Sequence, residues 1–221
     1  MLVLKKKKVL SFWTGQPFTY LAYGIVKSGG RNNTGRICSF KHGGGVKKKY
    51  RIIDFVRNLF DIEGMIMRIE YDPNRTAFIA LVCYKNGIIS YIIAVEDMQL
   101  HDIITNYSSF DLGVNNDFLK IDFKSQKGSS LLLKDISAGS IVNNIELKPG
   151  QGSCFCRAAG TFAIVLNKYM ICDKSYILLR LPSGVEYLLL DNCRAVLGIV
   201  SNSVQREINL LKAGVLRNKG V

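Results

Sequence analysis

The segment AFIALVCYKNGIISYIIA, residues 77–94, decides the fold class of this chain. Two apolar runs flank Asn86-Gly87, and an Asn-Gly pair between apolar runs is the strongest short-range sign of a β-hairpin. Two more short apolar runs come before it, and the turn residues Asp72-Pro73-Asn74 lie between them and the hairpin. The sequence therefore predicts strands of a first small β-barrel at 50–55, 65–71, 77–84 and 88–94.

A second series of short apolar runs follows a polar stretch at residues 111–130, where we place a domain boundary. Its clearest turn is Pro182-Ser183-Gly184, because proline presets φ and glycine accepts a positive φ. The spacing of Val204, Ile208 and Leu211 predicts one short helix over 204–213, with Gly214 to end it. The second barrel is expected to use strands at 140–147, 161–166, 176–181, 185–190 and 194–200.

The charge of the chain is concentrated near its N-terminus. The formal net charge is +13, yet residues 1–53 hold twelve Lys and Arg and no Asp or Glu. The first acid is Asp54, and the other 168 residues are almost balanced, with 18 basic and 17 acidic side chains. A basic arm on a near-neutral body attracts polyanions, and nucleic acid is the leading partner.

Several other classes of protein fit the composition poorly. The six cysteines lie mostly in apolar stretches, which favours a reducing compartment, and Cys154-Phe155-Cys156 lacks the spacing and second ligand pair of a zinc site. The longest apolar runs are far too short to span a membrane. Residues 1–13 lack the pattern of a transit peptide. We expect no metal site and no cofactor, apart from structural Mg²⁺ held through RNA.

The sharpest motif is the pair of segments KSGGRNNTGR (27–36) and KHGGGVKKKYR (41–51). Glycines let the backbone approach a crowded sugar-phosphate chain, Arg offers a planar fork to phosphate, and Asn can bond to base or 2′-hydroxyl edges. His42 before three glycines could instead be the oxyanion loop of an esterase, but no G-x-S-x-G elbow is present. No Walker phosphate loop is present either. The chain is expected to have no catalytic residue and not to be an enzyme.

These segments resemble the ribosomal protein L2 family of the large subunit. The likeness continues, in the same order, in RIEYDPNR (68–75), NIELKPG (144–150), RAAGT (157–161) and LRLPSG (179–184). The resemblance implies an OB-type barrel followed by an SH3-like barrel, which agrees with the two strand series. It also implies binding to large-subunit rRNA near the peptidyl-transferase centre, with roles in subunit association and tRNA placement.

The expected organisation is all-β, with a basic N-terminal arm (1–49), an OB-type barrel (50–124), an SH3-like barrel (125–200) and a short helix with a truncated tail (201–221). Arg75 and Arg157 match positions that touch rRNA in the family. Basic and polar residues of the arm and the barrels complete the candidate rRNA-binding set, which comprises Lys27, Ser28, Arg31, Asn32, Asn33, Arg36, Lys41, His42, Lys47, Lys48, Lys49, Arg51, Arg75, Lys148, Arg157, Arg180, Arg194, Lys212 and Arg217.

Three features depart from the family pattern. The chain ends soon after Lys212-Ala213-Gly214, where the family continues with a basic, glycine-rich extension. A separate polypeptide is expected to supply that part, and its loss is the alternative that the sequence leaves open. Residues 1–26 do not resemble the family. The chain is also unusually apolar, with a mean hydropathy of +0.14. Apolar residues such as Val56, Leu59, Phe60, Met65 and Met67 suggest contacts with additional proteins, with a larger internal core as the alternative.

These departures favour a protein of the mitochondrial large ribosomal subunit, with the chloroplast as the alternative compartment. The expected partners are large-subunit rRNA and neighbouring ribosomal proteins, not a second copy of the chain. The alternative function is a free OB-type module for single-stranded RNA. That module needs aromatic side chains stacked on one barrel face, and Tyr71, Phe78, Tyr84 and Tyr91 are its candidates.

Overall fold

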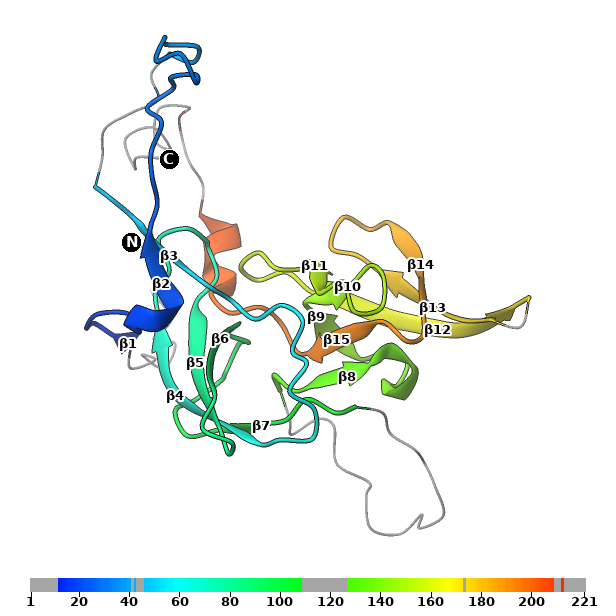
Figure 1. Ribbon diagram of the computed structural model, residues 1–221. Coiled ribbons are helices and arrows are strands. Elements are labelled where there is room, and N and C mark those ends of the chain that lie inside the picture. The colour runs from blue at the N-terminus through cyan, green and yellow to red at the C-terminus, as the bar shows by residue number, and fades with distance from the viewer. Residues whose placement is uncertain are drawn as a thin grey trace, which may run out of the picture.

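The computed structural model describes residues 12–40, 42, 46–108, 127–172, 174–208 and 212. Within these residues the chain is nearly all β, with two curled sheets that correspond to the OB-type and SH3-like barrels (Figure 1). The first sheet has the order β1-β4-β5-β6, and β7 pairs with β4. Its strands are β1 (Phe12–Trp13), β4 (Gly64–Glu70), β5 (Ile79–Tyr84), β6 (Ile89–Ile93) and β7 (Ile103–Ile104).

The second sheet has six strands in the order β14-β13-β12-β9-β15-β8. They are β8 (Ser130–Leu132), β9 (Ile141–Asn143), β12 (Ala163–Ile171), β13 (Lys174–Arg180), β14 (Glu186–Leu190) and β15 (Arg194–Leu197). Two small sheets complete the fold: β2 (Ala22–Gly24) with β3 (Lys49–Arg51), and β10 (Ile145–Glu146) with β11 (Ser153–Phe155). The helices are 3-10 turns, η1 (Thr19–Leu21), η2 (Leu133–Asp135) and η3 (Ser203–Glu207).

Both predicted hairpins are confirmed, and their turns have the same geometry. In the β5–β6 turn the Gly87 N–H donates to the Tyr84 carbonyl at 2.8 Å, and the Tyr84 N–H donates to the Ile88 carbonyl at 2.9 Å. Gly184 and Leu181 repeat this pattern between β13 and β14. The two glycines have φ values of +81° and +87°. Each loop is therefore a three-residue turn that ends in a left-handed glycine, not a two-residue turn.

Strand β5 explains why residues 77–94 lack polar alternation. Alternate residues of β5 enter two different core clusters: Ile79 and Leu81 pack on one side of the sheet, and Ala80 and Val82 pack on the other. A strand that is covered on both faces reads as a continuous apolar run.

Strand β15 also has alternate residues in two different cores, and it thereby connects the two barrels. Ala195 and Leu197 belong to the core of the six-stranded sheet, whereas Val196 packs in the core of the first barrel. An isolated bridge between Val95 and Val200 extends this contact. The two barrels therefore share a packed boundary that β15 lines on both sides.

The C-terminal helix is present but shorter than the sequence predicts. It is the five-residue 3-10 helix η3, and Ile208 already has extended backbone angles (φ −74°, ψ 108°). Val204 and Ile208 are 47% and 44% exposed, so these two side chains of the predicted helix do not pack against a core. An apolar spacing without burial does not sustain a helix. Residues 209–211 and 213 lie outside the described residues.

Candidate RNA-binding surface

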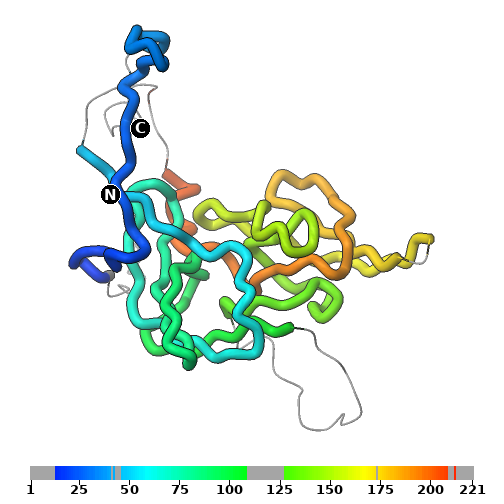
Figure 2. Tube along the Cα trace, in the orientation of Figure 1, coloured from blue at the N-terminus to red at the C-terminus, as the bar shows by residue number. Residues whose placement is uncertain are grey.

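The basic arm leaves the first barrel as β2 and returns as β3. These strands pair antiparallel, with Ala22 opposite Arg51 and Gly24 opposite Lys49. The segment between them projects away from both barrels in Figures 1 and 2. The prediction of a barrel strand at 50–55 is wrong: β3 ends at Arg51 and pairs with β2 in a separate sheet, and Ile53 makes only an isolated bridge to Tyr91. Strand β2 was not predicted, because three-residue strands carry no readable periodicity.

Asn32 shapes the tip of the arm. Its Oδ1 accepts hydrogen bonds from the Thr34 N–H at 3.1 Å, the Thr34 hydroxyl at 2.7 Å and the Arg36 N–H at 3.0 Å. Arg31 and Ile37 form a β-bridge on either side of this turn. The side-chain oxygen of Asn32 therefore binds groups within the protein, and only the N–H groups of its side-chain amide remain to contact a ligand.

The polar side chains predicted on the arm face solvent. Lys27, Ser28, Arg31, Asn32, Asn33, Arg36, His42, Lys47 and Lys49 are exposed, Lys48 is half-buried, and Lys41 lies outside the described residues. The Lys27 ammonium donates to the Val46 carbonyl at 2.8 Å, which ties the two sides of the arm together. Because the sequence has no acid before Asp54, this positive charge is not compensated within the arm. Such a surface is suited to phosphates.

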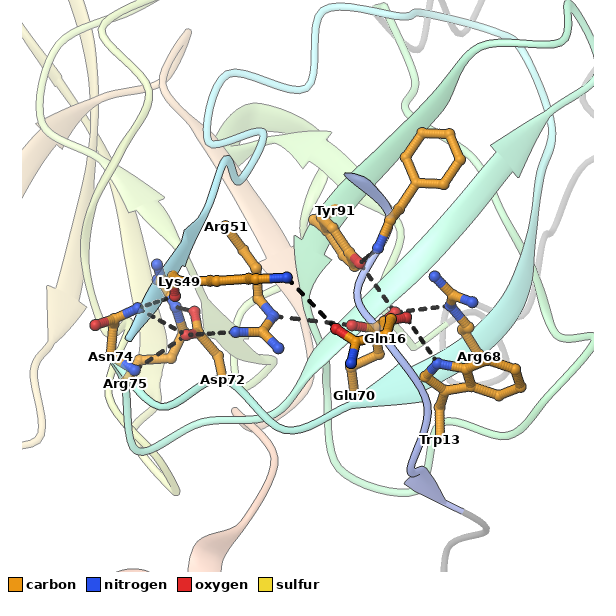
Figure 3. Close-up of polar contacts among 11 residues, drawn as sticks. Trp13, Gln16, Lys49, Arg51, Arg68, Glu70, Asp72, Asn74, Arg75 and Tyr91 are labelled. Carbon is orange, nitrogen blue, oxygen red and sulfur yellow. Dashed lines mark hydrogen bonds and ion pairs between the residues drawn. The ribbon is translucent and has the colours of Figure 1, made fainter. Parts of the chain in front are cut away.

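Two buried carboxylates anchor the root of the arm to the first barrel (Figure 3). Glu70 and Asp72 are 2% and 0% exposed. Arg51 of β3 lies between them, with Nε 3.8 Å from Glu70 and Nη1 3.6 Å from Asp72. Arg68 and Arg75 flank this centre, at 2.7 Å from Glu70 and 2.6 Å from Asp72. Buried carboxylates need such partners, so three arginines are held in fixed positions.

The same network extends to Trp13 near the N-terminus and to the Asp72-Pro73-Asn74 turn. The Tyr91 hydroxyl donates to Glu70 at 2.9 Å, and burial raises the pKa of Tyr91. The Arg68 guanidinium stacks 4.7 Å from the centroid of the Trp13 ring. Asn74 donates to the Lys49 carbonyl at 2.7 Å (Figure 3). The acids and Trp13 were not among the predicted site residues, although two carboxylates two positions apart at the end of an apolar strand were a readable signal.

Arg75 and Arg157 meet at one aromatic ring. Their guanidinium carbons lie 5.9 and 5.2 Å from the centroid of Phe55, which places both in cation–π range. Arg157 is exposed, whereas the Arg75 side chain is 18% exposed and pairs with Asp72. The structure thus brings together the two arginines that the family resemblance singles out, from opposite barrels.

Two of the predicted residues point into the protein. Arg51 is buried between Glu70 and Asp72, and Arg194 is 8% exposed. The Arg194 guanidinium donates to the Tyr107 and Ser108 carbonyls at 2.7 and 3.1 Å and stacks 4.1 Å from the centroid of Phe60. Burial lowers the pKa of Arg194. Both side chains therefore bind protein groups in this structure.

The remaining basic candidates differ in how freely they face solvent. Lys148, Arg157 and Lys212 are exposed, Arg180 pairs with Glu186 at 2.8 Å, and Arg217 lies outside the described residues. Lys148 is carried by a loop that the buried Glu146 shapes. The carboxylate of Glu146 accepts from the Gly152 and Gly150 N–H groups at 3.0 and 3.3 Å and from the Arg194 N–H at 3.0 Å.

The aromatic residues proposed for a free RNA-binding module are mostly core. Tyr84 and Tyr91 are 2% and 0% exposed, and Phe78 packs against the first barrel's core. Tyr71 is exposed at 63%. One exposed ring among these four candidates does not make a stacking platform, so they do not support the free module.

The cysteines and the exposed apolar residues of the first barrel complete the comparison with the sequence. All six cysteines are unbridged. The described part of the chain holds no cluster of three metal-ligating side chains and no helix long and apolar enough to cross a bilayer. Val56, Phe60, Met65 and Met67 are 40–45% exposed, as expected, whereas Leu59 is partly buried against the core.

These observations define a two-barrel protein with a projecting basic arm that is suited to binding RNA. Comparison with known proteins makes the assignment specific. Residues 20–106 match the RNA-binding N-terminal domain of ribosomal proteins L2, and residues 126–221 match the C-terminal domain. This chain belongs to the ribosomal protein uL2 family.

Bacterial relatives show the same relationship over most of the chain. Large ribosomal subunit protein uL2 of Dinoroseobacter shibae is 44% identical over 209 residues, which is 95% of this chain and 69% of the relative. The corresponding protein of Rickettsia canadensis is 44% identical over 204 residues, 92% of this chain and 68% of the relative. Because the N-terminal match begins at residue 20, the expectation that none of residues 1–26 resembles the family is wrong. The strand β2 lies in that part.

Proposed function

We propose that this chain is a structural constituent of a large ribosomal subunit, and that its arm penetrates folded rRNA near the peptidyl-transferase centre. The observation that carries the proposal is the projecting arm, whose exposed cations have no acidic neighbour before Asp54. Phosphates would neutralise that charge and release counterions. The relatives carry the name large ribosomal subunit protein, which supports the assignment and gives the chain no enzymatic role.

The proposed rRNA contacts fall into two groups. The arm supplies Lys27, Ser28, Arg31, Asn32, Asn33, Arg36, Lys41, His42 and Lys47 to Lys49, and the barrels supply Arg75, Lys148, Arg157, Arg180, Lys212 and Arg217. For Arg51 and Arg194 we propose a supporting role. Their side chains hold the arm root and the region between the barrels, so their effect on RNA passes through the fold.

The division into four parts is also a proposal, with the arm at 1–49, the barrels at 50–124 and 125–200, and the tail at 201–221. The two family matches, which end at residue 106 and begin again at residue 126, support a boundary between the barrels.

We infer a mitochondrial location from the apolar composition, with a mean hydropathy of +0.14. We further propose that a separate polypeptide supplies the part of the relatives' length that this chain does not cover. Mass spectrometry of the purified subunit tests both ideas. Peptides that continue directly beyond Val221 would contradict the separate polypeptide, and recovery only from chloroplasts would contradict the mitochondrial location.

Two native cysteines offer a direct test of the arm. Cys38 is exposed near its tip, and Cys172 is exposed at the far end of the β12–β13 hairpin. A hydroxyl-radical-generating iron chelate would be attached at Cys38 in the Cys172→Ser protein, and at Cys172 in the Cys38→Ser protein. In reconstituted subunits the Cys38 probe should cleave rRNA near the peptidyl-transferase centre, and the Cys172 probe should not. Equal cleavage patterns from both positions would refute the proposal.

A further inference from the structure

The outer face of the β12–β13–β14 sheet is apolar. The strand register places Tyr169 opposite Tyr176 and Leu178 opposite Leu188, and Ile171 follows two residues after Tyr169 on the same face. None of these five residues belongs to the barrel core or to the apolar residues packed against it. Tyr169, Ile171 and Leu188 are 42%, 45% and 45% exposed. A solvent-facing antiparallel sheet normally carries polar residues at such positions, so this face is built to be covered.

The β12 strand beside this face also has a free edge. β12 pairs with β13 along its length, but with β9 only at Ala163 and Ile164. From Asn167 to Ile171, within the described residues, the second edge of β12 has no strand partner. That part of the hairpin extends beyond the rest of the barrel (Figure 1). Unpaired backbone groups along a strand edge accept another extended chain.

The charge around the face argues for protein and against RNA. Arg180 and Glu186 neutralise each other at one end. Lys174, at the other end, and Lys168, on the opposite face of β12, are exposed and have no ion pair among the described residues; the Lys168 ammonium donates to the Lys134 carbonyl. Two separate lysines give little attraction for a nucleic acid backbone, in contrast with the arm. An apolar centre with a sparse polar rim is the composition of a protein interface.

We propose that this face and the free edge of β12 bind an extended segment of a neighbouring protein of the large subunit. The segment adds as a strand along Asn167 to Ile171 beside Tyr169, and places an acidic side chain near Lys174. Because Leu188 lies on β14, two strands away from β12, the continuation of the segment crosses the outer face to cover it. The inference rests on the proposed ribosomal role, because it requires the chain to sit beside other proteins.

Photo-crosslinking in intact purified subunits tests the contact. Benzoylphenylalanine would replace Tyr169 or Leu188, and the matched control would replace Tyr187, which lies on the opposite face of β14 with its ring 5.6 Å from Phe155. Both outer positions should crosslink to one short segment of the same protein, and the control should not. Crosslinks to rRNA or to a second copy of this chain would overturn the proposal, as would different proteins at the two outer positions.

Hydrogen exchange measures the added strand itself. Amides of residues 167–171 that face away from β13 should exchange at least about tenfold more slowly in the subunit than in the free chain, a change equivalent to about 1.4 kcal/mol. Leu188→Lys should abolish this protection, whereas Val185→Lys at the exposed turn should keep it. Unchanged exchange in a subunit that contains the chain would refute the docking while leaving the ribosomal role intact. Failure of the chain to enter subunits would instead refute the ribosomal role.

Discussion

Removal of two arginines from the tip of the arm should weaken rRNA binding and flatten its salt dependence. Arg31 and Arg36 are exposed, and no acidic residue precedes Asp54 to compensate them. Each phosphate contact contributes about 0.7–0.9 to the slope of log K against log salt concentration. Replacement of both residues by Gln should therefore lower the slope by about 1.5. At about 1 kcal/mol for each exposed charged contact, affinity at moderate salt should fall roughly 30-fold.

The assay is fluorescence anisotropy of a large-subunit rRNA fragment across a KCl series at constant Mg²⁺. A control with the same charge change is Lys85→Gln/Lys127→Gln. These two lysines already pair with Glu63 at 2.8 Å and Asp97 at 3.0 Å, and they lie on the first barrel and at the start of the second. The control should keep the slope of the unaltered protein. If the two double variants gave the same slope, net charge and not the arm would account for binding.

Three further predictions concern the fold that carries the arm. Glu146→Gln should lower the free energy of unfolding by about 2–3 kcal/mol, because three backbone N–H groups lose a charged acceptor, and urea denaturation measures this. Gly160→Ala should cost about 1–3 kcal/mol, because φ is +66° and the added Cβ would lie 2.8 Å from the Ser203 Cα; an unchanged melting temperature would contradict this. Burial and the nearby Glu146 raise the pKa of Cys193 to about 11, so its thiol should be alkylated at pH 8 far more slowly than the exposed Cys172. The associated stability is complete below the ordinary thiol pKa of 9.0 and should decline as the pH rises towards about 11, which pH-dependent unfolding tests.

The sequence predicted those parts of the fold that depend on local chemistry. Asn86-Gly87 and Pro182-Ser183-Gly184 stand between apolar runs, and both turns form with the glycine at positive φ. The strands β1 and β7, in contrast, have two residues each and exist through pairing with the remote strand β4. No periodicity can reveal such strands, because tertiary pairing alone creates them.

The candidate site was predictable as a charge pattern but not as a geometry. The exposed cations of the arm follow directly from a basic sequence without acids. The inward position of Arg51 and Arg194 does not, because an arginine is normally a surface residue and only the buried partners reveal otherwise. Glu70, two residues after Arg68 in a buried strand, was the local hint that arginines are held inside.

The resemblance to the family singled out Arg75 and Arg157, which charge and spacing in the sequence do not distinguish from other arginines. Phe55 lies in the first barrel, and Arg75 of that barrel and Arg157 of the second both lie within cation–π distance of its ring. The distance between these arginines in the sequence gives no indication that they meet. Only the packing of the two barrels brings them to one side chain.

The most direct test of the central claim is the sedimentation of this chain from its source cell. The source cells would be lysed gently in magnesium, the lysate separated on a sucrose gradient, and each fraction assayed for the chain by mass spectrometry and for large-subunit rRNA. The account predicts that the chain migrates with the large subunit and that ribonuclease treatment releases it. Recovery only in light fractions free of RNA would contradict the ribosomal assignment.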